Sequence, residues 1–262
     1  MLVSEVMLQQ TPVTRVLPVY AAWLARWPSP ADLAAEPAGE AVRAWGRLGY
    51  PRRALRLHAA ACAIVREHRG RVPDTVDALL VLPGVGQYTA RAVAAFAFGA
   101  RTPVLDVNVH RVLQRAVNGT DEPGTPTTAD RRLLEALLPD EPAVASRFSV
   151  ALMELGALVC TAARPRCSQC PIAVGCRWLQ LGSPVAVRPK RVQGWVGTDR
   201  QVRGRIMAVL RDSAAPVPES VLAEVWPDRE QWRRCLAGLL ADGLATTAGR
   251  DSSGRPLVAL PG

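Results

Sequence analysis

The sequence has no long apolar run, no secretory signal and almost no lysine. Arginines interrupt the apolar stretches, so none approaches the roughly 20 residues that a membrane-spanning helix needs. The opening residues, MLVSEVMLQQT, contain neither a basic segment nor a small-residue cleavage site. Lys190 is the one lysine, so arginine carries the basic charge. We therefore expect a cytoplasmic, nucleoid-associated protein without a membrane partner.

Arginine makes the chain strongly basic. Its 32 basic residues against 23 acidic ones leave a net charge of +9 and an isoelectric point near 10.1. Cations on a protein surface release the counterions that condense on a polyanion, which favours a nucleic-acid partner. Solubility is an equal alternative, because a genome rich in G and C also inflates arginine. Charge alone does not decide between these interpretations.

The apolar pattern predicts a mostly helical chain. A chain of 262 residues can bury one or two cores, and its apolar residues recur at helical spacing. No alternating strand pattern occurs before residue 240, although two runs near the C-terminus flank a turn and predict a small hairpin. Thr11 and Pro12 are an expected N-cap and first-turn pair. Helices are expected at residues 30–35, 40–47, 52–67, 75–80, 88–98, 108–117, 129–138, 142–158, 200–211, 218–225 and 229–242.

Composition changes after the last clustered cysteine. Residues 183–199 mix proline, glycine and basic side chains without periodicity, which is typical of a linker. The sequence thus predicts a helical domain over residues 1–182. Residues 200–262, with three helices and a hairpin, predict a small winged-helix-like unit.

Four of the six cysteines crowd into seventeen residues, with the spacing C-x6-C-x2-C-x5-C. Disulfides are not expected in a cytoplasmic protein, whereas grouped thiolates suit zinc or an iron–sulfur cluster. A zinc site more often has two C-x2-C pairs separated by a longer loop. Here the ligands follow a helix end in one compact loop, which favours a cluster and leaves zinc open. The candidate ligands are Cys160, Cys167, Cys170 and Cys176.

Two further segments have features of phosphate-binding sites. Arg164 and Arg166 lie between the first two cysteines, where a metal-pinned loop would present fixed cations; a solvated arginine pair is the alternative. The segment Leu82-Pro83-Gly84-Val85-Gly86 separates two predicted helices. Its glycines permit a tight turn whose backbone N–H groups point outward beside a helix N-terminus. An ordinary turn between helices is the other interpretation.

Two carboxylates stand out by their surroundings. Asp106 lies at a predicted helix start in LDVNVHRVL, where an N-cap is the common role. Glu5 lies among apolar neighbours in SEVMLQQT, where an isolated carboxylate is costly unless it has a partner or a function. Together they would supply an acid and a charge stabiliser for cleavage of a glycosidic bond.

These features occur in the order found in one family. The chain resembles the helix-hairpin-helix–GPD superfamily of DNA glycosylases, and residues 1–182 are similar to its adenine DNA glycosylase branch. The motifs that carry the resemblance are SEVMLQQT, LGY, LPGVGQYTA, LDVNVHRVL and MELGALVCT. The resemblance implies an all-α fold with a six-helix barrel at about residues 1–115 and a [4Fe–4S] module at about 116–182. It also implies a monomer that acts on mispaired double-stranded DNA.

The resemblance implies the chemistry of adenine excision opposite 8-oxoguanine or guanine. Glu5 would protonate N7 of a flipped adenine and then help to activate water, and burial favours its neutral form. Asp106 would stabilise the positive charge on the sugar electrostatically or through a transient covalent adduct. Tyr88 and Asn108 would support the pocket. The endonuclease III-like branch has a Schiff-base lysine at the position of Tyr88, so strong lyase activity is not expected.

The resemblance also implies a DNA-binding surface. Gln10 and Tyr50 match positions that fill the vacated base stack, although a core or surface role is the alternative for Tyr50. Thr11 and Arg52 are expected beside them, and Arg47 and Arg53 are near enough in sequence to hold phosphates. The hairpin residues Leu82, Gly84, Val85 and Gly86 would bind the DNA backbone.

Two departures from the family pattern leave alternatives open. The chain begins almost at Glu5, which suggests a misassigned start codon or a truncated, weaker enzyme. Its C-terminal region is too short and too helical for the Nudix-like domain with which relatives inspect 8-oxoguanine. A mismatch-specific thymine glycosylase on the same scaffold is one alternative function. A non-catalytic iron–sulfur DNA-binding regulator is another.

Overall fold

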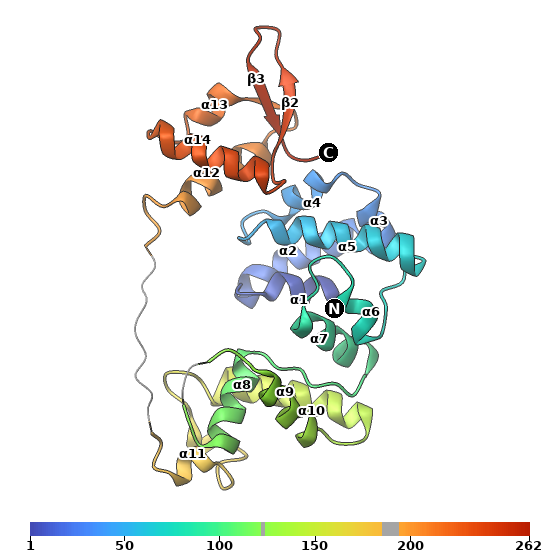
Figure 1. Cartoon of the computed structure of the whole chain (residues 1–262), viewed down its shortest axis with the longest axis vertical. Coiled ribbons are helices and arrows are strands. Elements are labelled where there is room, and N and C mark those ends of the chain that lie inside the picture. The colour runs from blue at the N-terminus through green and yellow to red at the C-terminus, as the bar shows by residue number, and fades with distance from the viewer. Residues whose placement is uncertain (122–123, 185–193) are drawn as a thin grey trace. The chain divides into compact units, whose positions relative to one another are not determined.

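Helices make up most of the regular structure (Figure 1). The computed structural model describes residues 1–121, 124–184 and 194–262. Contacts divide the chain into two units. The terminal unit comprises Leu2–Pro73, Val81–Val85 and Val192–Gly262, and the central unit comprises Met1, Asp74–Leu80 and Gly86–Arg191. Each unit is described by itself.

The N-terminal part of the terminal unit is built around α5 and three tryptophans. The ring of Trp23 meets Trp27 at 4.7 Å and Trp45 at 5.8 Å, both edge-on, and all three side chains are buried. Helix α5 packs against α3 and α4, because its alanines and leucines face them. The helices of this part are α1 (Leu2–Leu8), α2 (Val13–Arg26), α3 (Pro30–Ala34), α4 (Ala38–Trp45) and α5 (Arg52–His68).

Local signals explain several helix ends but fail at α2. Ser29 and Asp32 form a reciprocal capping box at the start of α3, with Pro30 in the first turn. Helix α2 begins at Val13, and its N-cap Pro12 makes no side-chain cap. The expectation that Thr11 caps this helix is wrong, because the Thr11 hydroxyl is buried and bound elsewhere.

The central unit has a helical core beside two π-helical turns. Leu105, Val109, Leu113 and Leu134 form one buried cluster. The predicted single helices at 108–117 and 142–158 each continue into a π-helical turn. The elements of this unit are α6 (Val76–Leu80), α7 (Gln87–Phe98), α8 (Val107–Leu113), η1 (Gln114–Asn118), α9 (Thr128–Leu137), α10 (Pro142–Glu154), η2 (Leu155–Val159), η3 (Cys167–Gln169) and α11 (Arg177–Gln180).

Helix α10 and the turn after it are more apolar than expected. The window Pro142–Val159 is long and apolar enough to cross a membrane by length and composition, with a mean hydropathy of 1.4. The expectation that no apolar run approaches this length is therefore wrong. Phe148, Leu152 and Met153 from this helix nevertheless pack against the buried core of the central unit. Within the structure 17% of this window is buried.

The C-terminal region contains three helices and a small sheet. They are α12 (Asp199–Asp212), β1 (Val217–Pro218), α13 (Glu219–Ala223), α14 (Arg229–Ala241), β2 (Thr246–Arg250) and β3 (Pro256–Ala259). The strands are antiparallel in the order β1-β3-β2, with Val217 opposite Val258. The predicted hairpin is confirmed, but β1 was missed. Residues 185–193 of the predicted linker lie outside the described residues.

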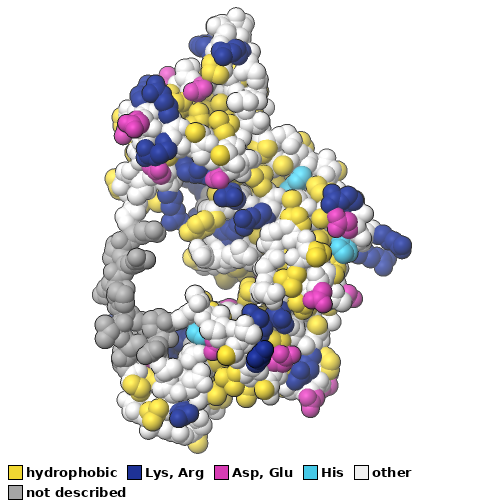
Figure 2. Space-filling view, in the orientation of Figure 1, with side chains coloured by type: hydrophobic (Ala, Val, Ile, Leu, Met, Phe, Trp, Pro, Cys, Tyr) yellow, Lys and Arg dark blue, Asp and Glu magenta, His cyan; other side chains and the backbone are white. Residues whose placement is uncertain are grey.

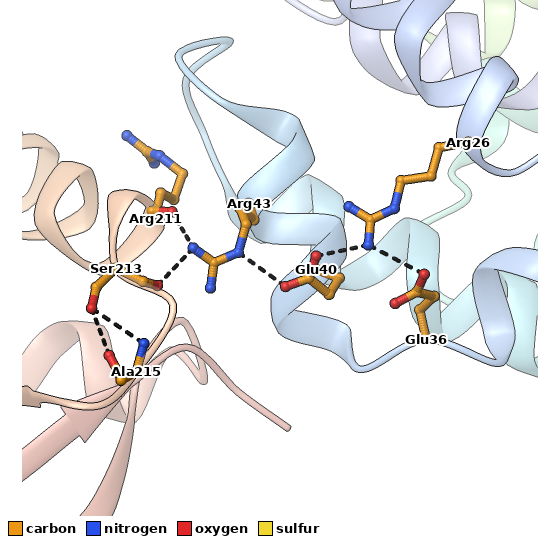
Figure 3. A network of polar contacts seen from close by, with 7 residues as sticks. All are labelled: Arg26, Glu36, Glu40, Arg43, Arg211, Ser213 and Ala215. Carbon is orange, nitrogen blue, oxygen red and sulfur yellow. Dashed lines mark hydrogen bonds and ion pairs between the residues drawn. The ribbon is translucent and has the colours of Figure 1, made fainter.

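The C-terminal region packs on α4 (Figure 3). The Arg43 guanidinium donates to the carbonyls of Arg211 and Ser213 and pairs with Glu40, which also pairs with Arg26. The backbone N–H of Gly39 donates to the carbonyl of Pro261 at 2.7 Å. These contacts place residues 199–262 in one unit with the N-terminal helices. Figure 2 shows basic side chains on the C-terminal helices of this unit.

Candidate active site and DNA-binding surface

Asp106 is held by two donors at the start of α8. Its Oδ1 accepts the Val109 backbone N–H at 2.7 Å, and its Oδ2 accepts Asn108 Nδ2 at 3.0 Å. The predicted N-cap is therefore confirmed. Both bonds hold the carboxylate in one orientation. Such a group is suited to stabilise a positive charge that develops nearby.

Asn108 connects Asp106 to the cysteine segment through Arg111. Arg111 Nη2 donates to Asn108 Oδ1 at 2.9 Å and to the Gly156 carbonyl at 2.6 Å. Its Nε donates to the Cys160 carbonyl at 2.7 Å. The carboxylate is thus the end of a continuous hydrogen-bonded chain within the central unit.

Gly156 leaves the space that Asn108 occupies in this series of hydrogen bonds. A Cβ added there would lie 2.8 Å from both the Cβ and the carbonyl oxygen of Asn108. We expect Gly156→Ala to displace Asn108, to slow base excision about 100-fold and to lower the free energy of unfolding by about 1–3 kcal/mol. Single-turnover excision and thermal unfolding measure the two effects. Gly204→Ala is the control, because a Cβ added at Gly204 would have no atom of another part of the chain within 4 Å. A Gly156→Ala protein with the wild-type excision rate would contradict this account.

Tyr88 is the residue that the resemblance aligns with the lysine of the endonuclease III-like branch. It is half-buried on α7 and packs against the core made by Ala92, Ala95 and Val104. A phenol at this position has no amine with which to form a Schiff base. The central unit therefore contains a carboxylate and an aromatic side chain at the positions predicted for the pocket.

Glu5 is buried in the terminal unit. It lies on α1 and is followed by the buried residues Val6 and Met7, and it is itself 9% exposed. Such burial is unusual for a carboxylate and is typical of a group with a specific task. Glu5 belongs to the terminal unit and Asp106 to the central unit. Their meeting across one nucleotide therefore stays a prediction.

Gln10 and Tyr50 share a rare backbone conformation. Both are exposed, and both have positive φ angles, +55° and +48°. Non-glycine residues adopt this region seldom, and they do so more often at functional sites. Both positions were predicted from the resemblance to fill the vacated base stack. Their conformation and exposure agree with side chains that project from the protein surface as a wedge.

The buried guanidinium of Arg53 binds both of the segments that carry Gln10 and Tyr50, which we call the wedge segments. Arg53 donates to the Gln9 carbonyl at 2.5 Å, to the Gly49 carbonyl at 3.1 Å and to the Thr11 hydroxyl at 3.1 Å. It is 8% exposed, and burial lowers its pKa. The expectation that Arg53 holds phosphate is therefore wrong. Thr11 is also buried, and its hydroxyl is bound inside the protein, which does not favour its expected contact with DNA.

We expect Arg53→Met to lower the free energy of unfolding by about 2–4 kcal/mol. The substitution keeps an apolar stem but leaves several buried carbonyls without a donor. Urea unfolding monitored by tryptophan fluorescence measures the change. Arg66→Met is the matched control on the same helix, because the Arg66 side chain is 72% exposed and pairs with Glu67. Equal stability of the two variants would show that the buried contacts are not required.

The hairpin presents its backbone and buries its side chains. Leu82 and Val85 are buried, and the Val85 N–H donates to the Leu82 carbonyl at 3.1 Å. Gly84 has a φ of +77°, and an added Cβ there would strike Arg56. Gly86 is exposed and precedes the first turn of α7. Phosphate contact at Leu82 and Val85 is thus limited to their backbone groups.

Arg52 is the exposed arginine at the start of α5. Its side chain is 56% exposed, and its guanidinium lies 3.2 Å from Asp242 of the C-terminal region. An exposed pair of this kind contributes little to stability. The predicted DNA contact of Arg52 is compatible with this geometry.

The four cysteines of the loop lie near one another but form no arranged metal site among the described residues. No group of three or more His, Cys, Asp or Glu side chains there is arranged to hold a metal ion. The thiols nevertheless influence one another, because burial and then the neighbouring Cys160, Cys170 and Cys176 raise the pKa of Cys167. Arg164 and Arg166 are exposed on this loop, as expected.

Arg115 was not singled out from the sequence. It is 2% exposed, pairs with Asp121 at 2.8 Å, and lies 3.4 Å from Cys160 Sγ and 4.8 Å from the Trp178 ring centroid. Burial opposes its charge, but its hydrogen bonds to Cys160 and Asp121 outweigh that effect and raise its pKa. A fixed cation beside the thiols suits a loop that carries thiolates.

The family model for HhH-GPD superfamily base excision DNA repair proteins matches residues 3–138. The chain belongs to this superfamily. An adenine DNA glycosylase of Mycolicibacterium smegmatis is 52% identical over 265 residues, which cover 97% of this chain and 89% of that protein. The human adenine DNA glycosylase is 46% identical over 177 residues, 67% of this chain and 32% of the human protein.

Solved structures agree with this HhH-GPD assignment. A thermostable thymine-DNA glycosylase matches with a TM-score of 0.63 and 28% identity, over 69% of this chain and 83% of that one. A non-covalent endonuclease III–DNA complex matches with a TM-score of 0.60 and 25% identity over the same shares. The HhH-GPD fold and the resemblance to adenine DNA glycosylases are confirmed. The protein is a DNA N-glycosylase of base excision repair that binds DNA.

Proposed function

We propose that the protein is a monofunctional adenine DNA glycosylase that acts as a monomer on chromosomal DNA in the cytoplasm. Its substrate would be adenine mispaired with 8-oxoguanine or guanine. The observation that carries the proposal is the Asp106 carboxylate, which two donors fix in a unit whose Tyr88 offers no amine nucleophile. The mycobacterial and human relatives carry the name adenine DNA glycosylase, which supports the same substrate.

In the proposed reaction Glu5 acts first, as a general acid. The buried carboxyl gives its proton to N7 of the flipped adenine, so the base leaves as a neutral molecule. The sugar becomes oxocarbenium-like as the glycosidic bond breaks, and Asp106 stabilises its charge. Glu5, now ionised, then accepts a proton from the attacking water. Asn108 keeps Asp106 oriented throughout, because it donates to Oδ2.

Base flipping uses the other features of the protein. Extrusion of a nucleotide costs a few kcal/mol and is least costly at a mispair. Gln10 and Tyr50 would occupy the vacated stack, and Arg53 holds the two segments that carry them. The hairpin N–H groups, Arg52, Arg164 and Arg166 would bind phosphates, which fixes the register without reading sequence.

We also propose a [4Fe–4S] cluster on Cys160, Cys167, Cys170 and Cys176. Four thiols on one short loop are a donor set that suits such a cluster, and the buried cation of Arg115 lies next to the first of them. The cluster would fix the loop and thereby the Cys160 carbonyl that accepts from Arg111. The C-terminal order of helix, strand, two helices and two strands favours a winged-helix-like unit.

A duplex panel tests the proposed substrate. Duplexes containing 8-oxoguanine·A, G·A, G·T or an abasic site are incubated with the protein and analysed with and without alkali. We expect release of adenine from the first two, with strand breaks appearing only after alkali. Release of thymine from G·T would favour the thymine glycosylase alternative, which the structural match to such an enzyme keeps relevant. Direct strand nicking would move the protein to the bifunctional branch.

Absorption spectra and metal analysis test the cluster. A purified protein that is brown and contains about four irons per chain would agree with the proposal. A colourless protein with stoichiometric zinc would assign the same thiols to zinc.

A further inference from the structure

A ladder of aromatic rings and guanidinium groups runs through the terminal unit. Arg53 lies 5.3 Å from the ring centroid of Trp45 and 5.4 Å from that of Tyr50. Arg200 then lies 5.1 Å from the ring of Tyr50 and 5.5 Å from the ring of Trp195. The ladder leads from Trp45, which is fully buried, to Trp195, which is 51% exposed. Two of its members thus come from the C-terminal region, far from Tyr50 in sequence.

Among the described residues, no carboxylate forms an ion pair with Arg200. Its neighbour Asp199 pairs instead with Arg234 at 2.9 Å and accepts from Gln231. The hydrogen bond from Arg234, and then the one from Gln231, lower the pKa of Asp199 to about 2. The Asp199 carboxylate is therefore paired with Arg234 and not with Arg200. Arg203 is likewise paired, with Asp242. Arg200 therefore presents a guanidinium beside two exposed rings.

This combination matches the chemistry of a nucleotide. Exposed aromatic rings stack on bases regardless of sequence, and a guanidinium binds the adjoining phosphate. Tyr50 and Trp195 are each about half exposed. The Arg200 guanidinium lies over both rings. A fully paired duplex has no free base face to offer, whereas an unpaired nucleotide does.

We propose that Trp195 and Arg200 extend the Tyr50 wedge into a stacking site for the nucleotide left unpaired when the target base is flipped out. The proposal rests on the proposed function, since it requires base flipping. It assigns to the C-terminal region a part in recognition of the opposite strand. Trp195 supplies ring surface, and Arg200 positions Tyr50 and holds a phosphate.

Binding to two non-cleavable duplexes tests the proposal. One duplex contains a tetrahydrofuran abasic analogue, which leaves its partner nucleotide unpaired, and the other is fully paired. Fluorescence anisotropy gives the affinity for each, and their ratio is the preference for an unpaired nucleotide. We expect Trp195→Ala and Arg200→Lys to reduce this preference about 10-fold with little change for the paired duplex. Trp195→Phe keeps a ring and should retain most of the preference.

Arg233→Ala is the control for loss of charge, because Arg233 is exposed on α14 and is not one of the guanidinium groups over the rings of Tyr50 and Trp195. It should leave the ratio unchanged. The proposal is overturned if Trp195→Ala and Arg200→Lys keep the wild-type ratio, or if they weaken both duplexes equally. Adenine release from a mispair is measured separately on the wild-type protein. If the wild-type protein released no adenine but kept the preference for an unpaired nucleotide, the proposed function would be refuted and the stacking site would be retained.

Discussion

Replacing Glu5 by glutamine is expected to slow adenine excision by about 100- to 10,000-fold while DNA affinity stays within about twofold. Glutamine has nearly the same shape and fits the same buried position on α1, where the residue is 9% exposed. It cannot give a proton to N7 or accept one from water, so the acid–base contribution is lost. Single-turnover excision from an 8-oxoguanine·A duplex measures the rate, and anisotropy measures binding.

The matched control is Glu67→Gln. Glu67 is an exposed carboxylate on α5 that pairs with Arg66, so its substitution should leave excision unchanged. A Glu5→Gln protein that excises adenine at the wild-type rate would remove Glu5 from the mechanism. If the wild-type protein also released no base but bound DNA, the non-catalytic regulator would become the better interpretation.

Asp106→Asn is expected to reduce excision about 100- to 1,000-fold with a small effect on stability. Asparagine caps helices about as well as aspartate, so the bond to the Val109 N–H can persist. The negative charge that stabilises the sugar cation is lost, and charge stabilisation of this kind is usually the largest catalytic term. The loss in unfolding free energy should stay below about 1 kcal/mol, because one bond to Asn108 weakens.

Two further variants separate the cap from the chemistry. Asp106→Ala removes both and should lose about 1 kcal/mol of stability in addition to the activity. Asp228 caps α14 through the N–H groups of Glu230 and Gln231, so Asp228→Asn changes a comparable cap away from the site. It should leave excision intact. Equal activity of Asp106→Asn and wild type would show that Asp106 serves only as a cap.

The helices were predictable because their signals are local. Apolar spacing located α5, α7 and α14 to within two residues at each end, and Gly99 ends α7 in the expected left-handed conformation. Strand β1 was missed because the contacts that form it are not local. It is a two-residue segment that becomes a strand by pairing with β3, about 40 residues later, and two residues have no periodicity.

Arginine roles were the least predictable part of the site. Arg52 and Arg53 are adjacent in sequence, yet the first is exposed and the second is buried among carbonyls. Their position on the helix α5 places them about 100° apart, and the packing of α1 against one face decides which is covered. The positive φ angles of Gln10 and Tyr50 were also invisible, because neither residue type requires them.

The sequence by itself determined the family, the order of the helices and the identity of the chemical groups: a carboxylate in an apolar helix, an N-cap aspartate, a glycine hairpin and four clustered thiols. These follow from short motifs and local periodicity. Only the tertiary structure decided that Arg53 holds the wedge segments, that Arg111 connects Asn108 to the cysteine loop, and that Arg200 lies against Tyr50. Burial and pairing depend on residues distant in the chain, and local pattern contains no information about those contacts.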